Sequence, residues 1–141
     1  MDRIKIKLPD NFNFSTEIPI RITDLNYQGH LGNDAVLSII HEARVSYLKN
    51  LGFVEVSPDG KGIIMVDSVI EYKSEGFYGD ILIAEVCVSD VDKLGCDFYY
   101  RLTNKNNNEE VALAKTGIIF YDYSTKKRMP VPEKFIRLIN G

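Results

Sequence analysis

The sequence predicts an α+β domain in which an antiparallel β-sheet curls around one long central helix. Residues 33–51 have the apolar spacing of a helix, and four later segments are rich in β-branched and aromatic residues. A sheet must cover one of its faces, and this helix is the only large apolar object available to do so. No repeat, linker or low-complexity block divides the chain, so residues 1–141 are expected to form a single domain.

The predicted central helix begins directly after a polar loop. Asn33 or Asp34 can cap its free amide groups, and Asn50 followed by Leu51 and Gly52 provides a stop. Its apolar stripe is wide, which indicates a helix wrapped by other structure. The stripe consists of Val36, Leu37, Ile39, Ile40, Ala43, Tyr47, Leu48 and Leu51.

The predicted strands are joined by connections that are too short for parallel crossovers and that fit an antiparallel meander. The polar run Asn104–Glu110 reads as an exposed hairpin turn, and Pro132 is placed to start a short final helix. Edge strands of such a sheet need protection, so a homodimer or a dimer of dimers is expected. The strands are expected at residues 15–22, 62–73, 80–90, 95–104 and 111–123.

The bulk composition argues against several classes of partner. The formal net charge of −3 does not fit a protein that binds nucleic acid or an anionic membrane. The basic run Lys126–Arg128 is expected to be a solvated turn. Cys87 and Cys96 lie in strand-like segments without metal-ligand spacing and are expected to be buried free thiols. With no signal-peptide pattern and no membrane span, a cytoplasmic location is expected.

The loop before the helix concentrates groups that can perform chemistry. A helix N-terminus presents free amides and a positive dipole end, which can stabilise an oxyanion. Carboxylates and an imidazole beside those groups would permit acyl or proton transfer. The alternative is structural: Asp34 caps the helix, Asn26 and Gly29 build a turn, and His30 merely packs. The polar residues are Asp24, Asn26, Gln28, Gly29, His30, Asn33 and Asp34.

The stretch RITDLNYQGHLGND, followed by HEAR, resembles the signature of hot-dog-fold acyl-CoA thioesterases. Within them it is most similar to the 4-hydroxybenzoyl-CoA thioesterase-like group. Residues 72–86 and 114–132 resemble later parts of the same family, so the likeness spans about residues 17–132. It implies a hot-dog fold that hydrolyses acyl-CoA or other pantetheine thioesters, without a metal or cofactor, in a groove at a dimer interface. The matching signature residues are Arg21, Asp24, Gly29, His30, Asn33, Glu42, Ala43 and Arg44.

One departure from the family pattern affects the chemistry. The second acidic residue of the family's D-x-D motif is the usual nucleophile or general base, and Asn26 stands in its place. An amide cannot accept a proton near neutral pH. Asp24 could serve instead, since alternation along an extended segment would keep it on the same side as Asn26. His30 could act as the base while Asn26 or Gln28 orients the substrate or a water. Glu42 or Asp34, on the helix, could supply the carboxylate.

The helix positions near Glu42 differ in their expected surroundings. Glu42 and Arg44 are two residues apart and cannot face each other, whereas Arg44 shares a face with Ile40 and Leu48. A buried charge in this helix would need a partner. His41 is expected at an exposed or interface position.

The resemblance also implies how the substrate is held. The acyl chain would run along the central helix, with Tyr47, Phe53 or Phe77 as wall residues. Phosphates of CoA need basic partners, and the candidates are Lys73, Lys115, Lys126 and Arg128.

Two other functions remain open. The loss of the acid at Asn26 would suit a non-catalytic acyl-thioester-binding protein. A hot-dog enoyl-CoA hydratase is the weaker alternative: its motif reads D-x-N-P-x-H, and DLNYQGH lacks the proline and has an additional residue before the histidine.

Overall fold

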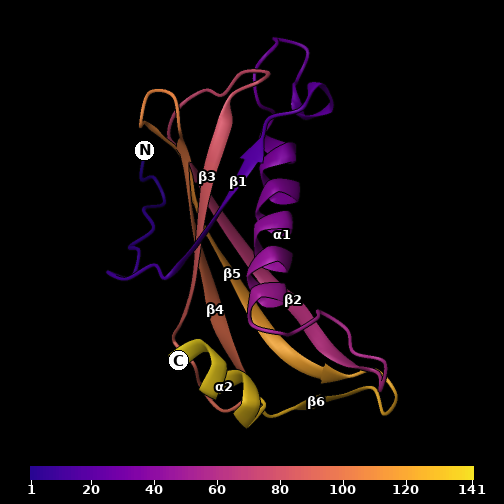
Figure 1. The fold of residues 1–141 in the computed structure, drawn as a ribbon. Helices are drawn as coiled ribbons and strands as arrows, with labels where there is room; N and C mark the ends of the chain where they lie inside the picture. The colour runs from indigo at the N-terminus through magenta and orange to yellow at the C-terminus, as the bar shows by residue number, and fades with distance from the viewer.

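The computed structural model describes all 141 residues, and its architecture is a curved antiparallel sheet with one long helix lying along its concave side (Figure 1). The strands have the spatial order β1-β3-β4-β5-β2, and the short β6 pairs with β5. The elements are β1 (Phe14–Pro19), a 3-10 turn (Ile22–Asp24), α1 (Asn33–Asn50), β2 (Lys61–Tyr72), β3 (Ile81–Ser89), β4 (Gly95–Asn104), β5 (Glu110–Asp122), β6 (Lys127–Met129) and α2 (Glu133–Asn140). No helix is long and apolar enough to cross a membrane.

Helix α1 buries its apolar stripe against the sheet. Tyr47 packs between Phe14 and Phe98, with ring centroids 5.3 and 6.0 Å away. Helix α2 lies at the end of the sheet where α1 finishes (Figure 1). Its Phe135 is 1% exposed and packs against the rings of Phe53, Phe98 and Phe120. The core therefore continues from α1 to α2.

Most of the predicted elements are confirmed within two residues. The hairpin turn between β4 and β5 is present, and Asn108 adopts the left-handed conformation that asparagine tolerates. Gly52, at φ +83°, follows the end of α1 as expected. Cys87 and Cys96 are buried free thiols, as expected, and burial raises the pKa of Cys87 to about 11.

Two boundaries differ from the sequence prediction. The first strand ends at Pro19, because Ile22–Asp24 forms a 3-10 turn rather than the end of a strand. The basic run is only partly a turn: Lys126 has φ +58°, but Lys127 and Arg128 belong to β6 and pair with β5. Both side chains are exposed there, so the prediction that the run is solvated is correct.

Strand β2 is an edge of the sheet and contains a bulge. It pairs with β5 alone, and Val66 is the additional residue between Met65, opposite Ile118, and Asp67, opposite Gly117. A bulge shifts the alternation of side chains by one residue. Met65 and Ser68 therefore face α1 together, although they are three residues apart.

Candidate active site

The beginning of the polar loop is fixed by an ion pair between Arg21 and Asp24. The Asp24 carboxylate accepts hydrogen bonds from the Arg21 main-chain amide at 2.8 Å and from the Arg21 guanidinium at 3.2 and 3.4 Å. Asp24 is 4% exposed, whereas Arg21 lies at the surface. Both Asp24 oxygens are thus engaged in holding the 3-10 turn.

Asn26 closes the next turn of the loop. Its side-chain Oδ1 accepts from the main-chain amide of Gln28 at 3.0 Å, and its carbonyl accepts from Gly29 at 3.0 Å. Gly29 has φ +86°, which a residue with a side chain adopts only with strain. The hydrogen bond from Gln28 occupies Oδ1, because only the oxygen of the Asn26 side chain can accept. The Nδ2 hydrogens of Asn26 are therefore left to donate to a ligand.

Helix α1 begins without a side-chain cap. The N-cap position is Gly32, which has no side chain to bond the free amides. Asn33 accepts from the amide of Asp34 at 3.0 Å, so the prediction that it satisfies a free amide is correct. Asp34 is exposed and makes no capping hydrogen bond, so that prediction is wrong. The positive end of α1 is therefore covered by few groups of its own chain.

A hollow of about 350 Å³ lies beside this helix end, between the loop and the end of β2. We call it the Asn26 hollow. It brings together four residues that the sequence analysis selected: Asn26, His30, Asn33 and Lys73. The rest of its wall was not predicted from the sequence. It consists of Leu31 from the polar loop and of Tyr72, Ser74 and Glu75 from the end of β2 and the loop after it. In the sequence, only the position of Tyr72, Ser74 and Glu75 at the end of the strand predicted at residues 62–73 could have indicated this part of the wall.

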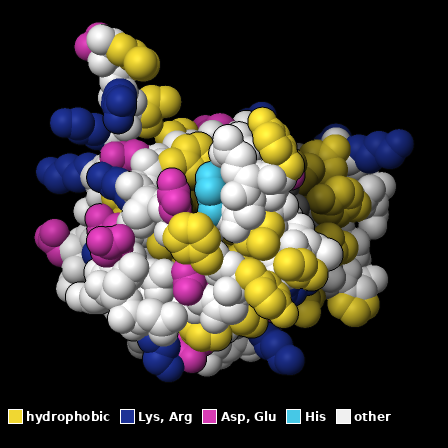
Figure 2. Space-filling model, turned by 90° about the horizontal axis from the view of Figure 1, so that it is seen from above, with side chains coloured by type: hydrophobic (Ala, Val, Ile, Leu, Met, Phe, Trp, Pro, Cys, Tyr) yellow, Lys and Arg dark blue, Asp and Glu magenta, His cyan; other side chains and the backbone are white.

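One side of His30, away from the polar lining of the Asn26 hollow, is aromatic. The His30 ring meets the edge of Phe77 at a centroid distance of 6.4 Å. Figure 2, which views this end of the molecule, shows a histidine side chain at the surface beside hydrophobic and acidic side chains. The loops here expose Ile22, Tyr27, Phe77 and Tyr78. An imidazole in this position is accessible to a substrate and is flanked by apolar surface.

Asp24 and Glu42 line a different hollow. It measures about 300 Å³ and is bordered by Arg21, Asp24, Ser38 and Glu42, with none of the residues of the Asn26 hollow. The expectation that Asp24 lies on the same side as Asn26 is wrong, because the chain at Asp24 is a 3-10 turn and alternation holds only for extended backbone. Glu42 is exposed.

Several other candidates lie away from the Asn26 hollow. Tyr47 is a core residue, 2% exposed, so it cannot form a wall of a substrate groove. Lys115 bonds Asp67 at 2.8 Å and lies 3.4 Å from Asp97; it is on the sheet face away from α1. Lys126 and Arg128 belong to the β5–β6 turn and strand. Phe77 borders His30 without lining the hollow, and Gln28 and Gly29 are exposed on the loop.

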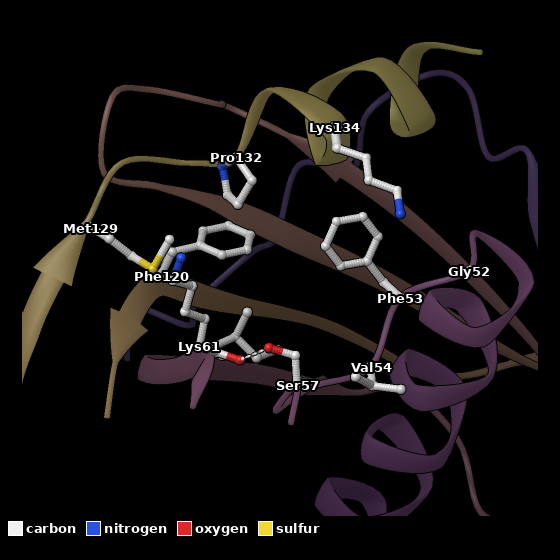
Figure 3. A pocket seen from close by; sticks show the side chains of 11 residues that line it. Gly52, Phe53, Val54, Ser57, Lys61, Phe120, Met129, Pro132 and Lys134 are labelled. Atoms are coloured by element: carbon white, nitrogen blue, oxygen red, sulfur yellow. Dashed lines mark hydrogen bonds between the residues drawn. The ribbon is translucent and has the colours of Figure 1, made fainter. Parts of the chain in front are cut away.

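Phe53 belongs to a cavity of about 250 Å³ at the opposite end of α1 (Figure 3). Phe53, Phe120, Met129 and Pro132 surround it, and the Lys134 ammonium lies 5.7 Å from the Phe53 ring centre. Ser57 donates to the Lys61 carbonyl at its edge. No carboxylate, imidazole or thiol borders this cavity, so it offers no carboxylate or histidine base and no nucleophilic thiol for acyl transfer.

Arg44 is the most deeply buried charged side chain of the molecule. Its side chain is 1% exposed; Nε donates to Glu55 at 2.8 Å and Nη1 donates to the Tyr100 hydroxyl at 3.2 Å. Tyr100 in turn shares a 2.8 Å hydrogen bond with Thr116, and burial raises the pKa of Tyr100. Glu55 also accepts from His41, which is exposed as expected. In the sequence, the helix face that Arg44 shares with Ile40 and Leu48 indicated that Arg44 is buried. The sequence did not indicate which residues bond to it.

Residues 20–139 match the family model of the thioesterase-like superfamily. The chain belongs to the thioesterase-like superfamily. The α+β class predicted from the elements and the hot-dog fold implied by the resemblance are confirmed by the family match and by the solved structures of thioesterases. No curated protein sequence matches the chain significantly.

Solved structures with the same fold share little sequence with this superfamily member. A 1,4-dihydroxy-2-naphthoyl-CoA thioesterase from Synechocystis is 18% identical with a TM-score of 0.83, over 90% of this chain and 95% of its own. A DHNA-CoA thioesterase from Staphylococcus aureus is 21% identical with a TM-score of 0.78, over 88% and 89%. YbaW, a probable thioesterase from Escherichia coli, is 19% identical with a TM-score of 0.76, over 89% and 98%.

Proposed function

We propose that this superfamily member hydrolyses acyl-CoA or related pantetheine thioesters at the Asn26 hollow. The observation that carries the proposal is the convergence of His30, Asn26 and the N-terminus of α1 on one hollow. An imidazole supplies a general base, and amide donors beside a helix N-terminus suit a carbonyl oxygen that gains negative charge. The names of the structural neighbours support the same class of substrate.

The proposed reaction uses only water and residues of the chain. Neutral His30 takes a proton from a water molecule, and the water oxygen bonds to the thioester carbonyl carbon. The carbonyl oxygen becomes an oxyanion, which Asn26 Nδ2 and the positive end of α1 stabilise. The tetrahedral intermediate then breaks its carbon–sulfur bond, and the imidazolium returns the proton to the leaving thiolate. The products are a free acid and a thiol.

Glu75 is the only carboxylate that borders the Asn26 hollow and is the second candidate for the base. Its side chain is exposed and lies on the loop between β2 and β3. Asp24 is a poor candidate because its two oxygens are bonded to Arg21. Its separation from His30 also gives no support to a hydratase, which needs both groups around one water.

The second candidate function is a protein that binds acyl thioesters without hydrolysing them. The observation in its favour is that Asn26 stands where the family pattern has an acid and is occupied in a turn. Release of free thiol from a panel of acyl-CoAs separates the two functions. We expect the wild type to release thiol, and Asp24→Asn to retain the activity within about fivefold, because an ion pair with an exposed arginine contributes less than about 1 kcal/mol.

One result would contradict the hydrolase proposal, and another would contradict the position of its general base. A folded wild type that releases no thiol from any acyl-CoA, together with an Asn26→Asp variant that gains activity, would identify a binding protein. Loss of activity in Asp24→Asn, with the fold retained, would instead move the general base from the Asn26 hollow to Asp24. Circular dichroism spectra of each variant show whether the fold is retained.

We further propose that the protein forms a homodimer through the free edge of β2. This edge exposes main-chain groups and the apolar side chains of Met65 and Val66, which are 43% and 52% exposed. Exposed edges of this kind are usually paired or protected. We expect sedimentation to give twice the mass of one chain, and Val66→Asp to shift it towards the monomer. Val91→Asp, an exposed valine in the β3–β4 loop, is the control and should leave the mass unchanged.

A further inference from the structure

A hollow of about 370 Å³ lies between α1 and β2, beyond the Asn26 hollow. We call it the Arg44 hollow. Leu37, Ile40 and Met65 give it apolar walls, and its hydrogen-bonding groups come from Ser38, His41, Arg44 and Ser68. Met65 and Ser68 face it together because of the bulge at Val66. A small oxygen-bearing group on an apolar chain would match this lining.

Arg44 has one hydrogen-bonding arm that the chain does not use. Nε and Nη1 donate to Glu55 and Tyr100, but Nη2 is buried and bonds to no atom of the protein. A buried donor without an acceptor costs about 1–3 kcal/mol, and more when the group is charged. Arg44 borders the hollow, and its Nη2 is the arm that no acceptor of the chain occupies.

The charge around Arg44 indicates which kind of acceptor fits. The Glu55 carboxylate, 2.8 Å from Arg44 Nε, already balances the guanidinium. A second carboxylate would leave an excess negative charge in a partly buried place, where charge is costly. An uncharged oxygen, such as a hydroxyl or a keto group, adds a hydrogen bond without that cost.

The two hollows follow one line along the helix. Asn33 borders the first, and Leu37 and His41 border the second; these three recur every four residues on one exposed face. On β2, Tyr72 borders the first hollow and Ser68 the second. Asn33 and Arg44 are eleven residues apart, so the helix places them about 16 Å apart along its axis.

We infer that the Arg44 hollow binds an uncharged oxygen near the far end of a long acyl group whose thioester lies in the Asn26 hollow. This inference rests on the proposed thioesterase function. The span of about 16 Å is too long for an acyl group of one ring, and it suits an extended chain of roughly twelve carbons. The acyl group passes over Leu37, and Arg44 Nη2 donates to its distal hydroxyl or keto oxygen. Arg44 is thus a specificity-determining residue rather than a catalytic one.

The test compares dodecanoyl-CoA with 12-hydroxydodecanoyl-CoA as substrates. For the wild type, we expect kcat/KM to be about tenfold or more higher for the hydroxylated chain, as a hydrogen bond to a charged donor provides. Arg44→Lys keeps the charge but removes the free guanidinium arm, and it should abolish the preference while dodecanoyl-CoA is still hydrolysed. Equal kcat/KM values in the wild type would overturn the inference and leave the proposed function intact.

A second variant keeps the test valid if Arg44→Lys does not fold. Leu37→Phe enlarges a residue that borders the hollow, and Val45→Phe makes a comparable change on the same helix outside it. Only Leu37→Phe should reduce the preference for the hydroxylated chain; an equal reduction in both variants, or in neither, would contradict the inference.

Direct binding decides the case in which the wild type hydrolyses neither substrate. That result leaves the proposed function to be decided by the wider panel of acyl-CoAs. Calorimetry with 12-hydroxydodecanoic acid and dodecanoic acid then tests the hollow alone. A dissociation constant about tenfold lower for the hydroxy acid would support the site, whereas equal constants would overturn the inference.

Discussion

Replacing His30 with alanine is expected to lower kcat/KM for acyl-CoA hydrolysis by about 10²–10⁴-fold, the usual contribution of a positioned general base. His30 borders the Asn26 hollow together with Asn26 and Asn33. Asn26 cannot replace it, because its oxygen accepts from Gln28 and its nitrogen can only donate. Steady-state release of free thiol from the best substrate of the panel measures the effect.

The control for this variant is Tyr27→Ala in the same loop. Tyr27 is 99% exposed, so its truncation should leave both the fold and kcat/KM unchanged. Glu75→Gln removes the other candidate base from the hollow. If Glu75→Gln abolishes activity and His30→Ala retains it, the carboxylate is the base and the assignment of His30 is wrong.

The elements of the fold could be predicted from the sequence because each has a local signal. Helix α1 follows from the spacing of its apolar residues, and the strands follow from their composition and turn signals. The end of the first strand could not be predicted, because the Asp24 side chain bonds Arg21 and bends the chain into a 3-10 turn. A side-chain pair of this kind overrides the local pattern.

Only the side of the candidate site that the polar loop forms could be predicted from the sequence. Asn26, His30 and Asn33 come from one continuous segment and lie together as the resemblance implied. Tyr72 and Glu75 meet them through the tertiary fold, which places the end of β2 beside the loop. In the same way, Arg44 and Tyr100 are 56 residues apart, so no local pattern could pair them.

Glu55→Ala is expected to lower the free energy of unfolding by about 2–4 kcal/mol. The substitution leaves the Arg44 guanidinium buried without its counter-charge, and breaking a buried pair in this way costs about 3–5 kcal/mol. Glu55 is 24% exposed, so water lowers the cost somewhat. Urea unfolding followed by circular dichroism measures the change, and the slope of free energy against urea should stay the same.

The matched control is Glu85→Ala on the outer face of the sheet. Glu85 is 25% exposed and accepts from Arg101 Nε at 2.8 Å, the same distance as between Glu55 and Arg44 Nε. The two pairs differ chiefly in the exposure of the arginine side chain. Arg101 is 33% exposed, whereas Arg44 is 1% exposed. Glu85→Ala should therefore cost less than about 1 kcal/mol. If the two variants lose equal stability, burial of Arg44 does not set the cost, and its pair with Glu55 contributes no more than a surface ion pair.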